Sequence, residues 1–331
     1  MSRQEWNPGS ILSTASSCWE AITLQTAVKL DVFSCIEEGA QSPEAVSEKI
    51  GADARAVTML CNALAAIGLL EKREGRFENT GPARQYLVKS SPEYIGYIIT
   101  HFYHTVASWW HLPQAIRTGA QISSVYEKTE DERESFLMGM HNLASALAPK
   151  IAGILDLGGA GTLLDLGGGP GTYAVNFCLK NSDLTAFVFD LPESRLYAQR
   201  TIAGAGLSER ITFIPGNYTS EDIPGKYDAV WLSQILHAEG PADCRMLIGK
   251  AAAALNPGGA IYLHDFILNE DMAGPAFPAI FSLNMLVATR GGQAYSEGQL
   301  KSMLQQAGIS NIERLDFTGP NDSCIIRGRA A

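Results

Sequence analysis

The residues that could bind a ligand or take part in a reaction lie where short apolar runs end. Four glycines within residues 167–171 follow an apolar run over residues 161–166, and a segment that can form a helix begins at Thr172. Glycines let a backbone approach a ligand closely, and a helix N-terminus presents free N–H groups. A second apolar run ends at Asp190, about twenty residues further on. The pattern indicates a nucleotide or nucleoside site at the edge of an α/β sheet.

The totals limit the class of protein. The chain has 331 residues, 46% of them hydrophobic and 18% charged, which is enough for two domains with a substantial core. Its formal net charge of −10 argues against a nucleic acid or an anionic membrane as the main partner. No apolar run approaches the roughly 20 residues that span a bilayer, and the start at Met1 lacks the regions of a signal peptide. We therefore expect a cytoplasmic protein whose six scattered cysteines are reduced thiols.

The elements that position these residues fall into two sets. Residues 1–150 are mainly helical, and we expect them to form one domain whose last long helix ends near Pro149. Apolar residues recur at helical spacing over residues 10–40. Two apolar faces on such short helices predict burial against a second copy of the chain, and hence a homodimer.

A helix–helix–hairpin order lies inside this first domain. Ser42 is placed to cap one helix, a second helix runs from Asp53 to about Ile67, and two short strands surround a turn at Gly75. This order predicts a winged-helix-like fold, which is often associated with DNA binding. The second helix carries one basic residue, Arg55, so we expect an architectural role.

Residues 151–331 alternate between strands and helices, which predicts a mostly parallel, doubly wound α/β sheet. The expected strands are 162–166, 185–190, 211–214, 227–232, 260–266, 312–316 and 323–327. The clearest helices are 172–181, 193–205, 241–255 and 296–307.

The glycine turn admits more than one nucleotide. No Gly-Lys-Ser/Thr follows the glycines, which excludes a phosphate-binding loop. The glycines nearly satisfy the spacing of a dinucleotide-binding turn, which would indicate a nicotinamide-dependent oxidoreductase. This interpretation is disfavoured because the turn lies in mid-chain and because further polar residues, Asn217 and His237, follow later strands.

Taken together, these features resemble the class I S-adenosylmethionine-dependent small-molecule O-methyltransferases, in the group of plant caffeic-acid and bacterial natural-product enzymes. The resemblance covers nearly the whole chain. It rests on the joint order of Ser108-Trp109-Trp110-His111-Leu112, the helix with Phe136 and Met140, the glycine turn, Asp190-Leu191-Pro192, Leu255-Asn256-Pro257-Gly258-Gly259, and Met285-Leu286 before Gly291-Gly292. It implies a Rossmann-like catalytic domain over 151–331 and a winged-helix-like dimerisation and substrate-cap domain over 1–150.

The resemblance also implies a reaction. A sulfonium methyl donor is already activated, so the enzyme must align an acceptor hydroxyl and remove its proton. His237 occupies the family's general-base position, and Asp265 can hold one of its ring nitrogens. His264 is expected to point to the opposite sheet face. The chain departs from the family at Ala238 and Ala294, where acids are common.

The cofactor implied is S-adenosylmethionine, with S-adenosylhomocysteine as its product. The residues expected to contact it are Asp165, Gly167, Gly169, Gly171, Asp190, Leu191, Asn217, Tyr218 and Ser233. Asp190 would accept both ribose hydroxyls, and Asn217 would face the adenine amino group. A flat, aromatic acceptor would contact Ile99, Thr100, Phe136, Met140, Met285 and Thr289.

Other readings remain open. Relatives with this fold use the cofactor for decarboxylation or hydroxylation, and a winged-helix regulator that senses a ligand is a further alternative. His101, His104 and His111 suggest a metal by type, but no carboxylate or cysteine joins them at ligand spacing, so we expect no metal.

Overall fold

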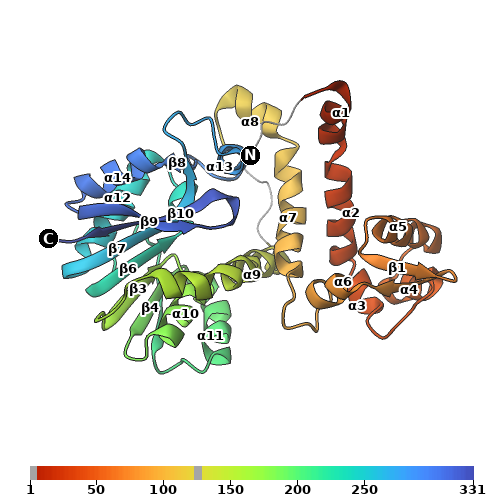
Figure 1. Ribbon diagram of the computed structural model, residues 1–331, viewed down its shortest axis with the longest axis horizontal. Coiled ribbons are helices and arrows are strands. Elements are labelled where there is room, and N and C mark those ends of the chain that lie inside the picture. Colours follow the sequence, from red (N-terminus) through yellow and green to blue (C-terminus); the bar gives the residue numbers. More distant parts are fainter. Residues whose placement is uncertain (1–5, 123–128) are drawn as a thin grey trace. The chain divides into compact units, whose positions relative to one another are not determined.

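The structure is a computed structural model that describes residues 6–122 and 129–331. Residues 1–5, at which the sequence lacks the features of a signal peptide, lie outside this range. The chain forms two compact units (Figure 1). The first comprises Met1–Val106 and Glu130–Asn142, and the second comprises Ala107–Thr129 and Leu143–Ala331. Each is described by itself.

The first unit is mainly helical, as expected. Ser42 and Asp53 cap two of its helices by accepting hydrogen bonds from the N–H groups of Ala45 (3.3 Å) and Ala56 (2.9 Å). The hairpin strands pair antiparallel around Gly75. The elements are α1 (Pro8–Ser16), α2 (Cys18–Lys29), α3 (Val32–Cys35), α4 (Pro43–Ile50), α5 (Ala54–Ala66), β1 (Leu70–Arg73), β2 (Arg76–Asn79), α6 (Gly81–Tyr86), most of α7 (Gly96–Trp109) and the start of α9 (Glu130–Ile154).

Helix α1 and the start of α2 leave several large apolar side chains of the first unit exposed. Its core packs α2 to α7 around buried residues such as Phe33 and Phe77. Helix α1, in contrast, has no buried residue. Trp19 at the start of α2 is 74% exposed, and Leu12 is 69% exposed. Large apolar groups this exposed are typical of a surface that another molecule covers.

The second unit is built on an eight-stranded sheet whose order is β5-β4-β3-β6-β7-β10-β9, with β8 added beside β7. Strands β3 to β7 are parallel, and β10 runs antiparallel to both of its neighbours. This confirms the mostly parallel sheet. The strands are β3 (Thr162–Leu166), β4 (Thr185–Asp190), β5 (Ile211–Pro215), β6 (Tyr227–Ser233), β7 (Leu255–Leu268), β8 (Tyr295–Ser296), β9 (Ser310–Thr318) and β10 (Ser323–Arg329).

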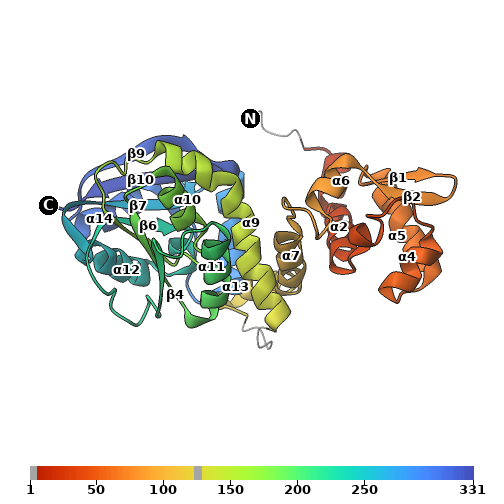
Figure 2. The same cartoon turned by 90° about the horizontal axis from the view of Figure 1, so that it is seen from below.

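Helices cover both faces of this sheet (Figure 2). One face carries the second half of α9, α10 (Thr172–Lys180) and α11 (Arg195–Gly204), and the other carries α12 (Pro241–Ala253) and α14 (Glu297–Gln306). The chain builds β3, β4 and β5 outward and then returns to place β6 on the other side of β3. In open α/β sheets, ligands bind at the carboxyl ends of the strands at such a reversal. The loops after β3 and β6 therefore form the candidate site.

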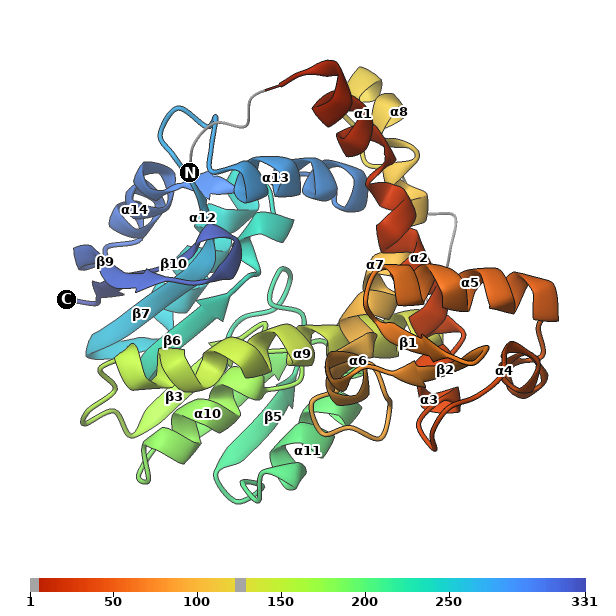
Figure 3. The same ribbon diagram turned by 45° about the vertical axis from the view of Figure 1, so that its right-hand side comes forward.

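Two helices differ from the sequence-based expectation. Helix α9 does not end at Pro149 but continues to Ile154 with the proline inside it. Buried residues on both sides of the proline, among them Ala148 and Ile151, pack on the sheet, and this burial outweighs the lost backbone hydrogen bond. Helix α13 (Ala276–Ala288) was not among the clear predictions because it is apolar around most of its circumference. It contacts β7 and α8 (Leu112–Thr118) (Figure 3).

Candidate active site

The glycine turn, residues 167–171, needs glycine for two physical reasons. Gly167, Gly169 and Gly171 have φ angles of 68°, 50° and 74°, which side chains rarely adopt. Gly168 is restricted by space instead, since a Cβ there would stand 2.5 Å from Cγ of Asp165. The sequence-based site omitted Gly168, although the unbroken run of three glycines was a usable signal.

Asp165 lies beneath this turn, where its side chain is almost fully buried. Its carboxylate accepts a hydrogen bond from the N–H of Ala174 in the first turn of α10, at 3.2 Å. Burial raises the pKa of Asp165 to about 7, with a smaller contribution from the charge of Asp190, against the bond from Ala174. Asp165 thus joins the end of β3 to the start of α10 and shapes the turn from below.

Asp190 ends β4 beside the turn, and its carboxylate is already well occupied. It accepts hydrogen bonds from the N–H groups of Gly169 (2.7 Å) and Leu191 (2.6 Å) and from the hydroxyl of Ser194 (2.9 Å). Burial raises its pKa, and these three bonds oppose the shift. A carboxylate has about four acceptor positions, so roughly one remains for a ligand rather than the two expected from the sequence.

The remaining expected cofactor residues have varied surroundings. The side-chain oxygen of Asn217 accepts from the N–H and the hydroxyl of Thr219, at 3.0 and 2.6 Å, so both of its acceptor positions are used. Tyr218 is half-buried, and its pKa is raised by burial and by the charges of Asp190 and Glu239. Leu191 is 41% exposed. The hydroxyl of Ser233 lies 2.8 Å from Nδ1 of His264.

His237 is brought to Asp265 from another strand. It lies in the loop after β6, on a short 3-10 turn (Leu236–Ala238), and Asp265 lies in β7. Nδ1 of His237 is 2.7 Å from Oδ1 of Asp265, and both residues are buried. The same carboxylate accepts from the N–H of Phe266 at 2.8 Å and from the N–H of His237 at 3.3 Å. Since an ionised carboxylate only accepts, Nδ1 carries the proton and Nε2 is left with a lone pair.

Aromatic rings flank the His237 imidazole, and sequence reasoning missed them. Phe266 stacks on it at 5.9 Å between centroids, and Phe281 of α13 meets it edge-on at 4.8 Å. Phe277 packs on both phenylalanines. Phe266 follows Asp265 directly in the sequence, which was a usable signal. The position of α13 gave none, because it depends on tertiary packing.

The histidine loop, residues 234–240, is held by groups far away in the chain. A Cβ on Gly292 would stand 2.4 Å from the carbonyl oxygen of His237, so the loop packs directly on the Gly291-Gly292 backbone. The hydroxyl of Tyr295 donates to the carbonyl of Glu239 at 2.6 Å. Gln234 opens the loop with a φ of 54°, a conformation that non-glycine residues rarely adopt. These contacts hold the loop although the common acids are replaced by Ala238 and Ala294.

The expected acceptor residues are distributed over both units. In the first unit, Ile99 is buried in the core and Met140 packs against that core, whereas Phe136 is 36% exposed beside His101. Thr100 is half-buried on α7.

In the second unit, Met285 is buried on α13. Thr289 is the C-cap residue of that helix and has extended backbone angles (φ −132°, ψ 162°); its shared face with Met285 stays a prediction. The Thr289 hydroxyl closes the helix by bonding to the carbonyl of Met285 and the N–H of Gly292.

The comparisons with known proteins agree on one family. Residues 111–310 match the O-methyltransferase domain, and residues 12–89 match the O-methyltransferase dimerisation domain. The chain is 30% identical to 3-hydroxy-5-methyl-1-naphthoate 3-O-methyltransferase of Streptomyces sahachiroi, over 97% of this chain and 95% of that protein. It is 30% identical to acetylserotonin O-methyltransferase of Gallus gallus, over 87% and 88%. The crystal structure of human N-acetylserotonin methyltransferase with S-adenosylmethionine matches at a TM-score of 0.87 and 25% identity, over 100% of both chains.

The described residues fit S-adenosylmethionine. The side-chain-free backbone of the glycine turn, the remaining acceptor position of Asp190 and the exposed apolar surface of Leu191 suit a nucleoside with an amino-acid tail. Within residues 6–122 and 129–331, no cluster of three or more histidine, cysteine or acidic residues could hold a metal ion. The same part of the chain contains no helix that is both long and apolar enough to cross a membrane. The chain belongs to the O-methyltransferases, enzymes that transfer a methyl group from S-adenosylmethionine to small molecules.

Proposed function

We propose that the enzyme methylates a hydroxyl group of a small aromatic molecule and that His237 is its general base. The observation that carries this proposal is the 2.7 Å contact between Nδ1 of His237 and Asp265. It fixes the tautomer, so the lone pair of Nε2 is available to take the acceptor's proton. The missing acid at Ala238 does not weaken this contact, because Asp265 comes from a different strand.

His237 and its neighbours have separate roles in this mechanism. S-adenosylmethionine, when bound, supplies an electrophilic methyl group. His237 removes the hydroxyl proton as the oxygen attacks, and Asp265 stabilises the imidazolium that forms. Phe266 and Phe281 restrict the imidazole to one orientation and keep water from its faces. Alignment of the acceptor provides most of the acceleration, and a positioned base adds roughly 10²–10⁴-fold.

An aromatic acceptor is supported by the surroundings of the base and by the relatives. Phe266, Phe277 and Phe281 gather beside His237 and suit a flat apolar ring. The two relatives at 30% identity are named for a hydroxynaphthoate and for acetylserotonin. The contacts expected for Ile99, Thr100, Phe136, Met140, Met285 and Thr289 stay predictions.

For the cofactor, we propose that Asp190 accepts one ribose hydroxyl and that the glycine turn surrounds the methionine part. Asp165 then acts through the turn rather than by direct contact, since it is buried beneath Gly168. Tyr218 packs on the adenine ring. Asn217 would have to release Thr219 before it could bind the adenine amino group.

We also propose that two copies of the chain pair through the exposed apolar residues of α1 and α2. The match of residues 12–89 to the dimerisation domain supports this. The winged-helix character of this region, the division at residues 150 and 151, and a cytoplasmic location remain predictions. The six cysteines, all described, are free thiols, as in a reducing compartment.

Replacement of the base tests the function. In His237→Ala, we expect methyl transfer to a phenolic acceptor to fall roughly 10²–10⁴-fold, because only the base is lost. The affinity for S-adenosylhomocysteine, measured by calorimetry, should stay near the wild-type value. Exposed His111 provides the matched control, and His111→Ala should leave both quantities unchanged.

Mass spectrometry of the product distinguishes the alternatives. A gain of one methyl group supports the proposal, whereas loss of carbon dioxide or gain of oxygen would indicate decarboxylation or hydroxylation. Undiminished turnover in His237→Ala would remove His237 as the base.

A further inference from the structure

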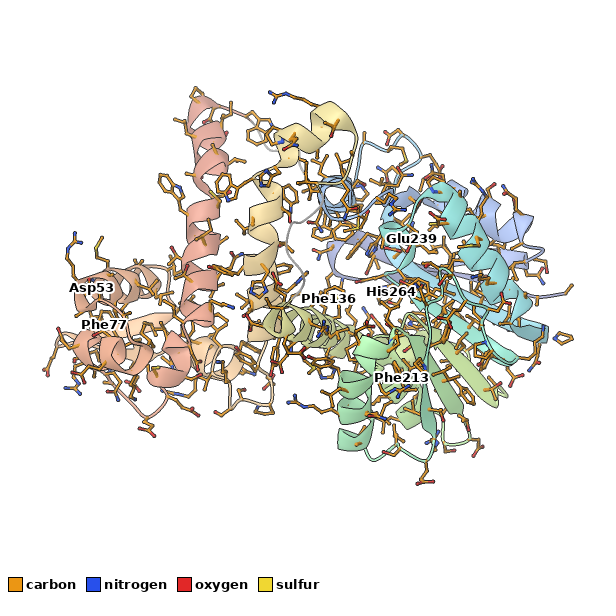
Figure 4. The ribbon with its side chains drawn as sticks, turned by 180° about the vertical axis from the view of Figure 1, so that it is seen from behind. Asp53, Phe77, Phe136, Phe213, Glu239 and His264 are labelled. Atoms are coloured by element: carbon orange, nitrogen blue, oxygen red, sulfur yellow. The ribbon has the colours of Figure 1, made fainter. Side chains whose placement is uncertain are left out.

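A buried polar cluster lies on the sheet face opposite Asp265. His264 lies in β7 next to Asp265 (Figure 4), and its side chain is fully buried. Its ring stacks on Trp231 at 5.6 Å between centroids and meets Tyr173 of α10 edge-on at 6.0 Å. Its Nδ1 lies 2.8 Å from the hydroxyl of Ser233, the last residue of β6. The mechanism above uses none of the His264 contacts.

The surroundings of His264 select one tautomer. Nε2 is buried and has no hydrogen-bond partner among the described residues. Orphaned buried N–H groups are rarer in proteins than under-satisfied acceptors, which favours an unprotonated Nε2. The proton therefore belongs on Nδ1, where it is donated to the Ser233 hydroxyl oxygen. Burial also lowers the pKa of His264 to about 4, so the ring is neutral at physiological pH.

This tautomer determines what Ser233 can do. A hydroxyl has two acceptor lone pairs and one donor hydrogen. His264 fills one lone pair of the Ser233 hydroxyl. The O–H of Ser233 is then not used by His264 and can donate to another group at the half-buried end of β6.

The position of Ser233 in the sheet follows from the strand register. Leu166 of β3 is paired with Leu232 of β6, so Ser233 stands beside Gly167, the first residue of the glycine turn. The proposed function places the methionine part of the cofactor along this turn. The acceptor that this part carries is its carboxylate.

We propose that His264 is a positioning residue that fixes Ser233 as a hydrogen-bond donor to the carboxylate of S-adenosylmethionine. The inference rests on the proposed cofactor contact of Ser233 and adds to it the buried group that sets its direction. It also explains how a neutral serine provides a dependable donor at this point.

The tautomer can be observed directly. Nitrogen NMR of protein labelled with ¹⁵N-histidine should find His264 with Nδ1 protonated and Nε2 unprotonated, both without ligand and with S-adenosylhomocysteine. A signal from protonated Nε2 would overturn the proposal without bearing on the methyl-transfer reaction.

Binding of S-adenosylhomocysteine, measured by calorimetry, tests the consequence. His264→Phe keeps the aromatic packing but removes the donor, and we expect affinity to weaken roughly three- to tenfold, the effect of one hydrogen bond. Ser233→Ala should weaken binding by a similar factor. The double variant should be no worse than either, because both changes remove the same contact.

Two further variants separate positioning from packing. His264→Asn can place an amide N–H near the position of Nδ1 and should restore near wild-type affinity. Phe317→Leu disturbs the ring packed at 6.0 Å from His264 without touching the hydrogen bond, and should leave affinity unchanged. Thermal unfolding of each variant confirms that it is folded.

The outcomes distinguish this inference from the proposed function. If Ser233→Ala binds normally, the cofactor contact of Ser233 is wrong and the positioning role falls with it. If Ser233→Ala weakens binding but His264→Phe does not, only the positioning role is wrong. Neither result affects the assignment of His237, whose variant is judged by methyl transfer.

Discussion

The glycine turn and the histidine loop follow parallel strands at the same edge of one sheet, yet they are held in place differently. The turn is fixed by partners near in sequence: Asp165 bonds to Ala174, nine residues away, and Asp190 bonds to Gly169, 21 residues away. The histidine loop depends on Asp265, 28 residues from His237, and on Tyr295, 56 residues from Glu239.

This difference separates two demands on the site. The turn is held by its own strand and helix and by the next strand along the chain, so its shape is tied to the folding of the sheet. A loop built from distant contacts takes its shape only when β7, α13 and the Gly291-Gly292 backbone are in place. We therefore expect damage to the turn to reduce stability and cofactor binding, and damage to the loop to reduce the chemical step.

The largest effect is expected from Asp165, as a change in how stability depends on pH. Its carboxyl is protonated more readily in the folded protein, because burial raises its pKa from 3.8 to about 7. The folded state then binds more protons between about pH 4 and 7, so this group lowers the free energy of unfolding as pH rises through that window, by up to about 4 kcal/mol.

Asp165→Asn removes this titration while keeping an acceptor for the N–H of Ala174. Denaturant unfolding at several pH values should give a difference between variant and wild type that grows in the variant's favour toward pH 7. A difference that is constant over pH 4–7 would contradict the raised pKa.

The second largest effect, a fall in kcat, is expected at Gly292, which packs against the histidine loop. In Gly292→Ala, the new Cβ would stand 2.4 Å from the carbonyl oxygen of His237 and must displace it. Misplacement of a catalytic group by about 1 Å can cost on the order of 10²-fold in rate, so we expect kcat to fall by that order. Affinity for S-adenosylhomocysteine should change little, since the glycine turn is untouched.

Gly291 offers a matched control for this variant. A Cβ on Gly291 would meet the Gly240 backbone at 3.4 Å, an ordinary contact, so Gly291→Ala should keep most of the activity. Equal losses in the two alanine variants would show that the histidine loop is not held in the proposed way.

The same contrast explains which parts of the fold could be predicted from the sequence and which could not. The strands, the cap at Ser42 and the glycine turn were predicted because periodicity and turn chemistry are local properties. The expected end of the helix near Pro149 was wrong, because burial on the sheet, a tertiary effect, outweighed the local preference of proline to end a helix.

For the site, the pairing of His237 with Asp265 was anticipated from strand ends and family resemblance, and the structure places the two in contact. The aromatic neighbours Phe266 and Phe281 and the packing of Gly292 were not anticipated, since they arise where separate elements meet. The sequence did not show that the side-chain oxygen of Asn217 is occupied, because this depends on a local turn with Thr219 that competes with ligand binding.

The smallest of these effects, and the one that tests the turn as a binding element, concerns Asp190. Asp190→Ala removes the acceptor of the Gly169 and Leu191 N–H groups together with the position left for a ribose hydroxyl. The loss of charge-assisted hydrogen bonds at a buried position should weaken S-adenosylhomocysteine binding about tenfold or more by calorimetry. With saturating donor, kcat should fall less than affinity, because His237 and Asp265 keep their contact. Exposed Asp183 is the matched control, and Asp183→Ala should bind normally. Wild-type affinity in Asp190→Ala would mean that the turn binds the cofactor through its backbone alone, and the two loops would then differ more sharply than proposed.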